Sequence, residues 1–146
     1  MEFEEDKLRE IVSRVLRETA EMPAFEKRVD TTGAILVKTR TIKTEPFEGR
    51  SDVRLMDFVT LEEAPRMGGG IMELLDGADF EWTLTYDEFD YVIDGTLEIV
   101  LDSGTVLKGG PGDILYIPKN SHIHFRTPTA ARYAYFVYPA NWQELA

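Results

Sequence analysis

Two patterns of apolar residues divide the chain. Between residues 4 and 20 apolar side chains recur at the three- and four-residue spacing of an amphipathic helix. These positions are Leu8, Ile11, Val12, Val15 and Leu16. Acidic residues lead the segment, arginines come late, and Met22-Pro23 ends the pattern. The pattern predicts an amphipathic helix within residues 1–22, followed by a linker over residues 23–32.

From residue 33 onward, short runs typical of β-strands alternate with turns. The runs cover residues 34–39, 53–59, 70–75, 80–85, 88–93, 96–101, 105–108, 114–117, 122–126 and 132–138. Asp94-Gly95 between two runs indicates a hairpin, because its tight turn needs positive φ. Many short strands at this spacing predict an all-β sandwich or barrel over residues 33–146.

The composition excludes several classes of function. There are 27 acidic and 16 basic residues and a net charge of -11, which argues against nucleic-acid or anionic-membrane partners. Without cysteine there is no disulfide, zinc–thiolate site or cysteine nucleophile. No apolar run spans a bilayer, and the first residues lack the basic and apolar parts of a secretion signal. We expect a cytoplasmic protein.

Two segments resemble the signature motifs of the cupin superfamily, a group of small β-barrels. Glu88, followed after six residues by Gly95, matches part of the first motif. Gly112, followed after five residues by Pro118, matches part of the second, with Asn120 where the family usually has glycine. The resemblance implies a cupin jelly-roll barrel (a double-stranded β-helix), and it implies a homodimer because cupins commonly pair through barrel sheets.

The positions of the usual cupin metal ligands hold other residue types. The two histidines of the first motif correspond to Trp82 and Leu84, and the late histidine corresponds to Ile123. A register slip by one residue would place Thr83 and Thr85 there, which are also poor ligands. One carboxylate, Glu88, cannot hold a transition metal alone. We therefore expect no such metal site.

The two histidines flank the last of these positions. His122 and His124 stand on either side of Ile123. Strand alternation turns them to the face opposite Ile123, so they should point out of the barrel if Ile123 points into it.

Glu88 and Asp90 are the candidate catalytic residues. They are two apart on a predicted strand, so both side chains leave the same face, and Glu88 faces inward in cupins. Two carboxyls in an apolar cavity repel, and one pKa should rise. The pair is a candidate for acid–base chemistry or for holding Mg²⁺; alternatively, an arginine or backbone donors satisfy it and it only stabilises the barrel. Trp82, Tyr86 and Tyr116 are candidate ligand-binding residues of the same cavity, with simple packing as the alternative.

Three segments resemble the EutQ family of ethanolamine utilisation, namely residues 80–90, 112–119 and 138–143. The resemblance implies ethanolamine catabolism, association with bacterial microcompartments and an acetate kinase activity that uses Mg-ATP. Nothing in the residues decides whether the chain is an enzyme. The alternative is a catalytically silent cupin that binds a small molecule or a shell protein and serves microcompartment assembly.

The segment from Leu8 to Leu16 is similar to the short amphipathic peptides that direct cargo into microcompartments. We therefore expect a possible shell-protein partner for this helix. The alternative is that its apolar stripe packs on its own domain or on a dimer partner.

Overall fold

The computed structural model describes residues 25–145. The helix predicted within residues 1–22 lies outside this range and stays a prediction. The chain divides into two compact units, residues 1–42 and residues 43–146. No helix within residues 25–145 is long and apolar enough to cross a membrane.

The described part of the first unit is a small hairpin. Strand β1 (Lys27–Val29) pairs antiparallel with β2 (Ile35–Val37), and a short 3-10 helix η1 (Thr39–Thr41) follows. The turn between the strands is held by Asp30, whose carboxylate accepts hydrogen bonds from the backbone N–H and the hydroxyl of Thr32. Strand β1 lies in the segment predicted as linker, where backbone pairing with β2 orders a polar sequence.

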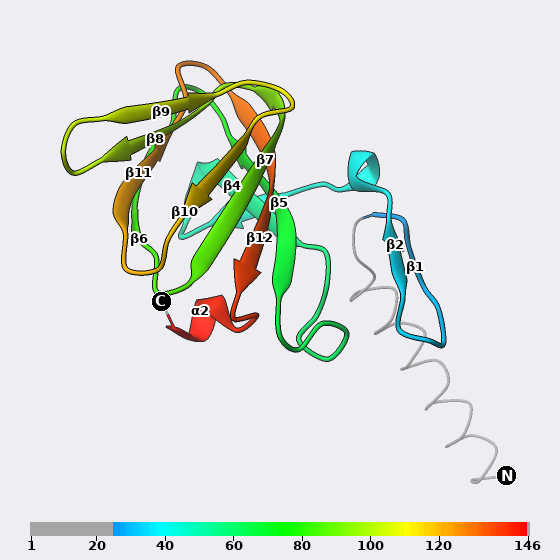
Figure 1. Ribbon diagram of the computed structural model, residues 1–146. Helices are drawn as coiled ribbons and strands as arrows, with labels where there is room; N and C mark the ends of the chain where they lie inside the picture. Colours follow the sequence, from blue (N-terminus) through cyan, green and yellow to red (C-terminus); the bar gives the residue numbers. More distant parts are fainter. Residues whose placement is uncertain (1–24, 146) are drawn as a thin grey trace, which may run out of the picture. The chain divides into compact units, whose positions relative to one another are not determined.

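The second unit consists of two antiparallel sheets that face each other (Figure 1). The larger sheet has the order β10 (Ile114–Ile117), β7 (Asp87–Gly95), β12 (Ala131–Tyr138), β5 (Gly68–Leu74), β4 (Arg50–Asp57) and β3 (Glu45–Phe47). The smaller sheet has the order β6 (Asp79–Thr83), β11 (His122–Arg126), β8 (Leu97–Leu101) and β9 (Val106–Gly109). A short helix α2 (Trp142–Leu145) follows β12 (Figure 1).

The core lies between the two sheets and is built by alternation along the strands. Inward-facing side chains from both sheets are almost fully buried, among them Val53, Leu74, Val92, Leu97 and Ile123. Charged residues occupy many of the intervening outward positions. The all-β fold predicted from the run of short strands is confirmed, since strands of the structure overlap every predicted run.

Candidate functional site

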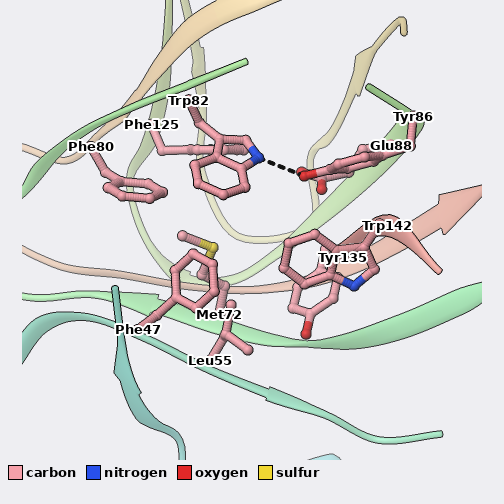
Figure 2. Close-up of a pocket in the computed structure, with 10 residues that line it drawn as sticks. All are labelled: Phe47, Leu55, Met72, Phe80, Trp82, Tyr86, Glu88, Phe125, Tyr135 and Trp142. Atoms are coloured by element: carbon pink, nitrogen blue, oxygen red, sulfur yellow. Dashed lines mark hydrogen bonds between the residues drawn. The ribbon is translucent and has the colours of Figure 1, made fainter. Parts of the chain in front are cut away.

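Aromatic side chains enclose a cavity inside the barrel. Its described lining consists of Phe47, Leu55, Met72, Phe80, Trp82, Tyr86, Glu88, Phe125, Tyr135 and Trp142 (Figure 2). The space in which a water molecule can be centred is about 20 Å³, which is room for about one water. In this conformation the barrel interior is therefore nearly filled by its own side chains.

Glu88 and Asp90 both point into the barrel from strand β7. Glu88 is 6% exposed and Asp90 is fully buried. Within the described residues, neither oxygen of Asp90 receives a hydrogen bond from an N–H or O–H donor. The charged group that acts on Asp90 is the carboxyl of Glu88, two positions earlier on the same strand face, which repels it. The predicted inward orientation of the pair is confirmed.

Burial dominates the electrostatics of this pair. Loss of hydration raises the pKa of Glu88 to about 7. Burial, followed by repulsion from Glu88, raises the pKa of Asp90 well above its usual range. At neutral pH the pair therefore keeps at least one proton, and it can donate a hydrogen bond to a negatively charged ligand. Among residues 25–145 the Asp90 oxygens have neither an arginine nor a backbone donor as partner, and the choice between a chemical and a purely stabilising role stays open.

The surroundings of the pair do not fit a Mg²⁺ ion. Magnesium needs near-octahedral oxygen ligands and keeps several water molecules. The cavity has room for about one water, and the described lining offers no carboxylate besides Glu88. Burial also favours the protonated carboxyls, which are poor ligands. These surroundings favour proton handling over metal binding, and the role of the pair stays a prediction.

Trp82 and Tyr86 lie in the cavity wall as predicted. The indole N–H of Trp82 donates a hydrogen bond of 2.7 Å to the Tyr86 hydroxyl oxygen (Figure 2). Burial, followed by the charge of Glu88, raises the pKa of Tyr86. Whether these aromatic residues bind a ligand stays a prediction.

The prediction that Tyr116 lines the cavity is wrong. Tyr116 is 48% exposed on the outer face of strand β10, where its hydroxyl donates to the Asp87 carboxylate at 3.1 Å. Its neighbours Leu115 and Ile117 take the buried positions instead. In a run of consecutive apolar residues alternation alone does not fix which face is buried; pairing of Ile117 with the inward-facing Glu88 fixes it here.

The positions of the usual cupin metal ligands are filled by packing side chains. Leu84 and Ile123 are almost fully buried, and Trp82 lines the cavity. Among residues 25–145 no three histidine or acidic side chains are placed to hold a metal ion together. The alternative register with Thr83 and Thr85 inward is wrong, because Thr83 lies on the outer face opposite His122.

The two histidines point out of the barrel, as predicted. The imidazole of His122 contacts Asp102 at 2.6 Å and Glu81 at 3.1 Å. That of His124 contacts Asp79 at 2.5 Å and Glu81 at 3.6 Å. Hydrogen bonds to Asp102 and then Glu81 raise the pKa of His122. The histidines form a polar ladder on the smaller sheet and do not reach the cavity.

Sequence analysis missed three residues at the barrel mouth. Tyr135 and Trp142 belong to the cavity wall, and the Tyr135 hydroxyl donates a hydrogen bond to the carboxylate of Asp57. Asp57 could have been found from alternation, because it follows the inward positions Val53 and Leu55 on the same strand face. Trp142 carried no comparable signal, since its helix has only four residues.

Two facing antiparallel sheets, with the two cupin-like motif segments at strands β7 and β10, define this unit as a cupin. The cupin domain of Cnp3 from Schizosaccharomyces pombe, only 11% identical, has the same fold with a TM-score of 0.59 over 76% of this chain and 79% of that chain. The family model "Ethanolamine utilisation protein EutQ" matches residues 3–144. The chain therefore belongs to the EutQ family of ethanolamine utilisation.

Relatives within this family match the chain over most of its length. A protein of Clostridioides difficile named acetate kinase EutQ is 40% identical over 92% of this chain and 88% of the relative. One of Salmonella typhimurium with the same name is 34% identical over 99% of this chain, which spans 66% of that relative. The solved structure of the Clostridium difficile EutQ protein superposes with a TM-score of 0.77, covering 84% of this chain and 93% of that chain at 40% identity.

Proposed function

We propose that this chain is an acetate kinase of ethanolamine utilisation, which transfers a phosphoryl group between ATP and acetate. Relatives named acetate kinase EutQ supply the reaction class. The observation in the structure that carries the proposal is the Glu88–Asp90 pair, buried and proton-bearing beside an aromatic cavity. Acetate has the matching chemistry, with a methyl group for the apolar wall and a carboxylate to accept hydrogen bonds.

In this reaction an acetate oxygen forms a bond to the γ-phosphorus, and the bond from that phosphorus to the β-phosphate oxygen breaks, releasing ADP. A protonated carboxyl of the pair donates a hydrogen bond to one acetate oxygen and so orients the other. The raised pKa values of Glu88 and Asp90 matter here, because two ionised carboxylates would repel the acetate anion.

The nucleotide stays at the mouth of the barrel in this proposal. The described lining of the cavity contains no lysine or arginine to hold a phosphate. The Mg²⁺ that accompanies ATP arrives with the nucleotide and neutralises the transferring phosphoryl group there. The catalytic contribution of the chain is therefore positioning of acetate.

The experiment is formation of acetyl phosphate from acetate and Mg-ATP by the purified full chain, trapped with hydroxylamine. Glu88→Ala and Asp90→Ala, which remove the hydrogen-bond donors, should each lower kcat/KM by roughly 10²-fold, the scale of one lost positioned donor. Glu81→Ala is the matched control, because this carboxylate is 65% exposed on the outer face of the smaller sheet. Absence of acetyl phosphate with the natural chain, or equal rates in all variants, would contradict the proposal.

A homodimer is part of the proposal. Six large apolar side chains form one exposed patch on the outer side of the larger sheet, which we call the outer aromatic face: Phe89, Tyr91, Ile114, Tyr116, Phe136 and Tyr138. Strands β10, β7 and β12 carry them side by side. An exposed apolar patch of this kind supports a protein partner, and a second copy of the barrel covers it in the way cupin sheets commonly pair.

Association with microcompartments is the last part of the proposal. It rests on family membership and on the apolar stripe of Leu8, Ile11 and Leu16 in the sequence, which lies outside the described residues. Co-purification with shells should be lost in Ile11→Glu if this segment binds a shell protein. Normal sorting of Ile11→Glu would count against that role. Sorting that depends on Ile11, in a chain without acetate kinase activity, would favour the non-catalytic alternative.

A further inference from the structure

The barrel cavity has a second hollow beside it, and one side chain lines both. The second hollow has a volume of about 220 Å³, compared with about 20 Å³ for the cavity inside the barrel. Its described lining consists of Asp57, Val59, Thr60, Leu61, Ala64, Gly68, Gly69, Ala140 and Trp142. Trp142 is the residue that lines both spaces. Its indole therefore stands between the barrel interior and the larger outer hollow.

Inside the barrel mouth the indole of Trp142 is surrounded by aromatic rings. Ring-centre distances are 5.5 Å to Tyr86, 6.0 Å to Phe47, 6.1 Å to Tyr135 and 6.4 Å to Trp82. Figure 2 shows the indole beside Tyr135, on the same side of the cavity as Tyr86 and Glu88. With the lining side chains in these positions, the free space fits about one water, so acetate reaches Glu88 only if part of this lining moves.

Asp57 lies beside helix α2 and contacts the side chains that surround Trp142. Its carboxylate accepts hydrogen bonds from the Tyr135 hydroxyl and from the side-chain amide of Gln143, the latter at 3.1 Å, and it interacts with the Trp142 side chain. Trp142 and Gln143 belong to helix α2, which is only four residues long. A helix of this length has little stability of its own. The position of Trp142 therefore depends on ring packing and on this one carboxylate.

The outer hollow offers the displaced indole somewhere to go. Val59, Leu61 and Ala64 give it apolar walls. The segment that carries these residues is held in shape by reciprocal hydrogen bonds, from the Thr60 backbone N–H to the Glu63 carboxylate at 2.9 Å and from the Glu63 backbone N–H to the Thr60 hydroxyl at 3.1 Å. A rotation of Trp142 into the hollow would place the indole against these apolar side chains, which offsets part of the lost ring contacts.

We propose that Trp142 is a movable plug of the barrel mouth and that Asp57 is its latch. The closed position described here excludes ligands larger than water from Glu88 and Asp90. The open position, with the indole in the outer hollow, joins the two spaces and admits the ligand. The inference rests on the two hollows and the latch contacts, and it does not depend on the identity of the ligand.

Fluorescence of the full chain tests this plug directly. Trp82 and Trp142 are the two tryptophans of the sequence, so Trp82→Phe leaves Trp142 as the single reporter. Acrylamide quenching then measures how often this indole is exposed. Adding Asp57→Ala should raise the quenching constant about five-fold, the scale of one lost net hydrogen bond. Adding Asp102→Ala, which removes a carboxylate from the histidine ladder, should leave it unchanged.

A second variant keeps the test decisive if Asp57→Ala does not fold. Gln143→Ala removes an exposed latch donor and should raise the quenching constant in the same direction. Equal quenching of Trp142 in the latch variants and the Asp102→Ala control would overturn the proposal.

Acetate separates this proposal from the proposed function. If calorimetry shows that acetate binds, the plug predicts a red shift of Trp142 emission on binding; binding with unchanged emission would overturn the plug. If acetate does not bind, the proposed function fails, and the quenching of the latch variants alone decides the plug.

Discussion

Tyr135 on strand β12 pairs with Asp90 on the neighbouring strand β7. Its hydroxyl nevertheless donates a hydrogen bond in the opposite direction, to Asp57 on strand β4. Tyr135 also pairs with Gly70, which in turn pairs with Asp57. The Tyr135 ring therefore crosses over Gly70 and leaves Asp90 without this donor. Paired residues on the four adjacent strands β7, β12, β5 and β4 thus connect the buried acid pair to Asp57 at the barrel mouth.

The absent side chain of Gly70 makes this crossing possible. A Cβ there would overlap the Tyr135 hydroxyl and the Met56 carbonyl oxygen. Gly70→Ala should lower the free energy of unfolding by about 1–3 kcal/mol, the usual cost of overpacking. Chemical denaturation measures this loss. Gly110→Ala is the control, since its Cβ meets no atom closer than 3.9 Å, and it should cost much less. Equal stability of both variants would contradict the crowding.

The buried acid pair should make the chain less stable as the pH rises. Glu88 has its pKa raised in the folded state from an ordinary 4.5 to about 7, so the folded chain binds more protons than the unfolded chain in this window. The contribution of Glu88 to the free energy of unfolding is then fully present below about pH 4.5 and is lost as the pH rises through about 7.

Urea unfolding at several pH values measures this dependence. His122 changes stability in the same direction, because its pKa is also raised. The natural chain is therefore compared with Glu88→Gln. The free energy of unfolding of Glu88→Gln should depend less on pH between pH 4.5 and 7. Identical profiles would show that Glu88 has an ordinary pKa.

The histidine ladder predicts a site-specific effect of Asp102. Its hydrogen bond is the largest cause of the raised pKa of His122. Asp102→Asn should therefore lower this pKa towards the ordinary 6.5. NMR titration of the two imidazole signals measures the change. Asp94→Asn, a change of the same chemistry in the hairpin turn outside the ladder, should leave the signal of His122 in place.

The outer aromatic face predicts the dimer interface. Phe136→Glu places a charge on this face, beside Phe89, and should convert a dimer to a monomer, because an unpaired charge buried in an interface is costly. Light scattering coupled to size exclusion measures the mass. Val106→Glu, at an exposed site on the smaller sheet, should leave the dimer intact. A monomeric natural chain, or a dimeric Phe136→Glu, would contradict this interface.

The fold was predictable because alternation and turn residues repeat along the whole barrel. The strands that escaped prediction are atypical. Lys27–Val29 is short and polar, and Glu45–Phe47 contains Pro46, which an edge strand tolerates. Both depend on pairing with a partner strand that local sequence does not reveal.

The site was predictable where strand alternation fixes the face. Glu88 and Asp90 are two residues apart, so one inward assignment placed both. Tyr116 failed because its run of apolar residues gives no alternation. The contact of Trp142 with the cavity joins the end of the chain to strands far away in sequence, and no local pattern encodes such a contact.

The protonation state of the Glu88–Asp90 pair tests the account most directly. Carbon-13 NMR of the side-chain carboxyls, assigned with Glu88→Gln and Asp90→Asn, follows both groups through a pH titration. The account predicts that the pair still carries a proton at pH 7. Titration of both carboxyls near their ordinary values of 4.5 and 3.8 would contradict it.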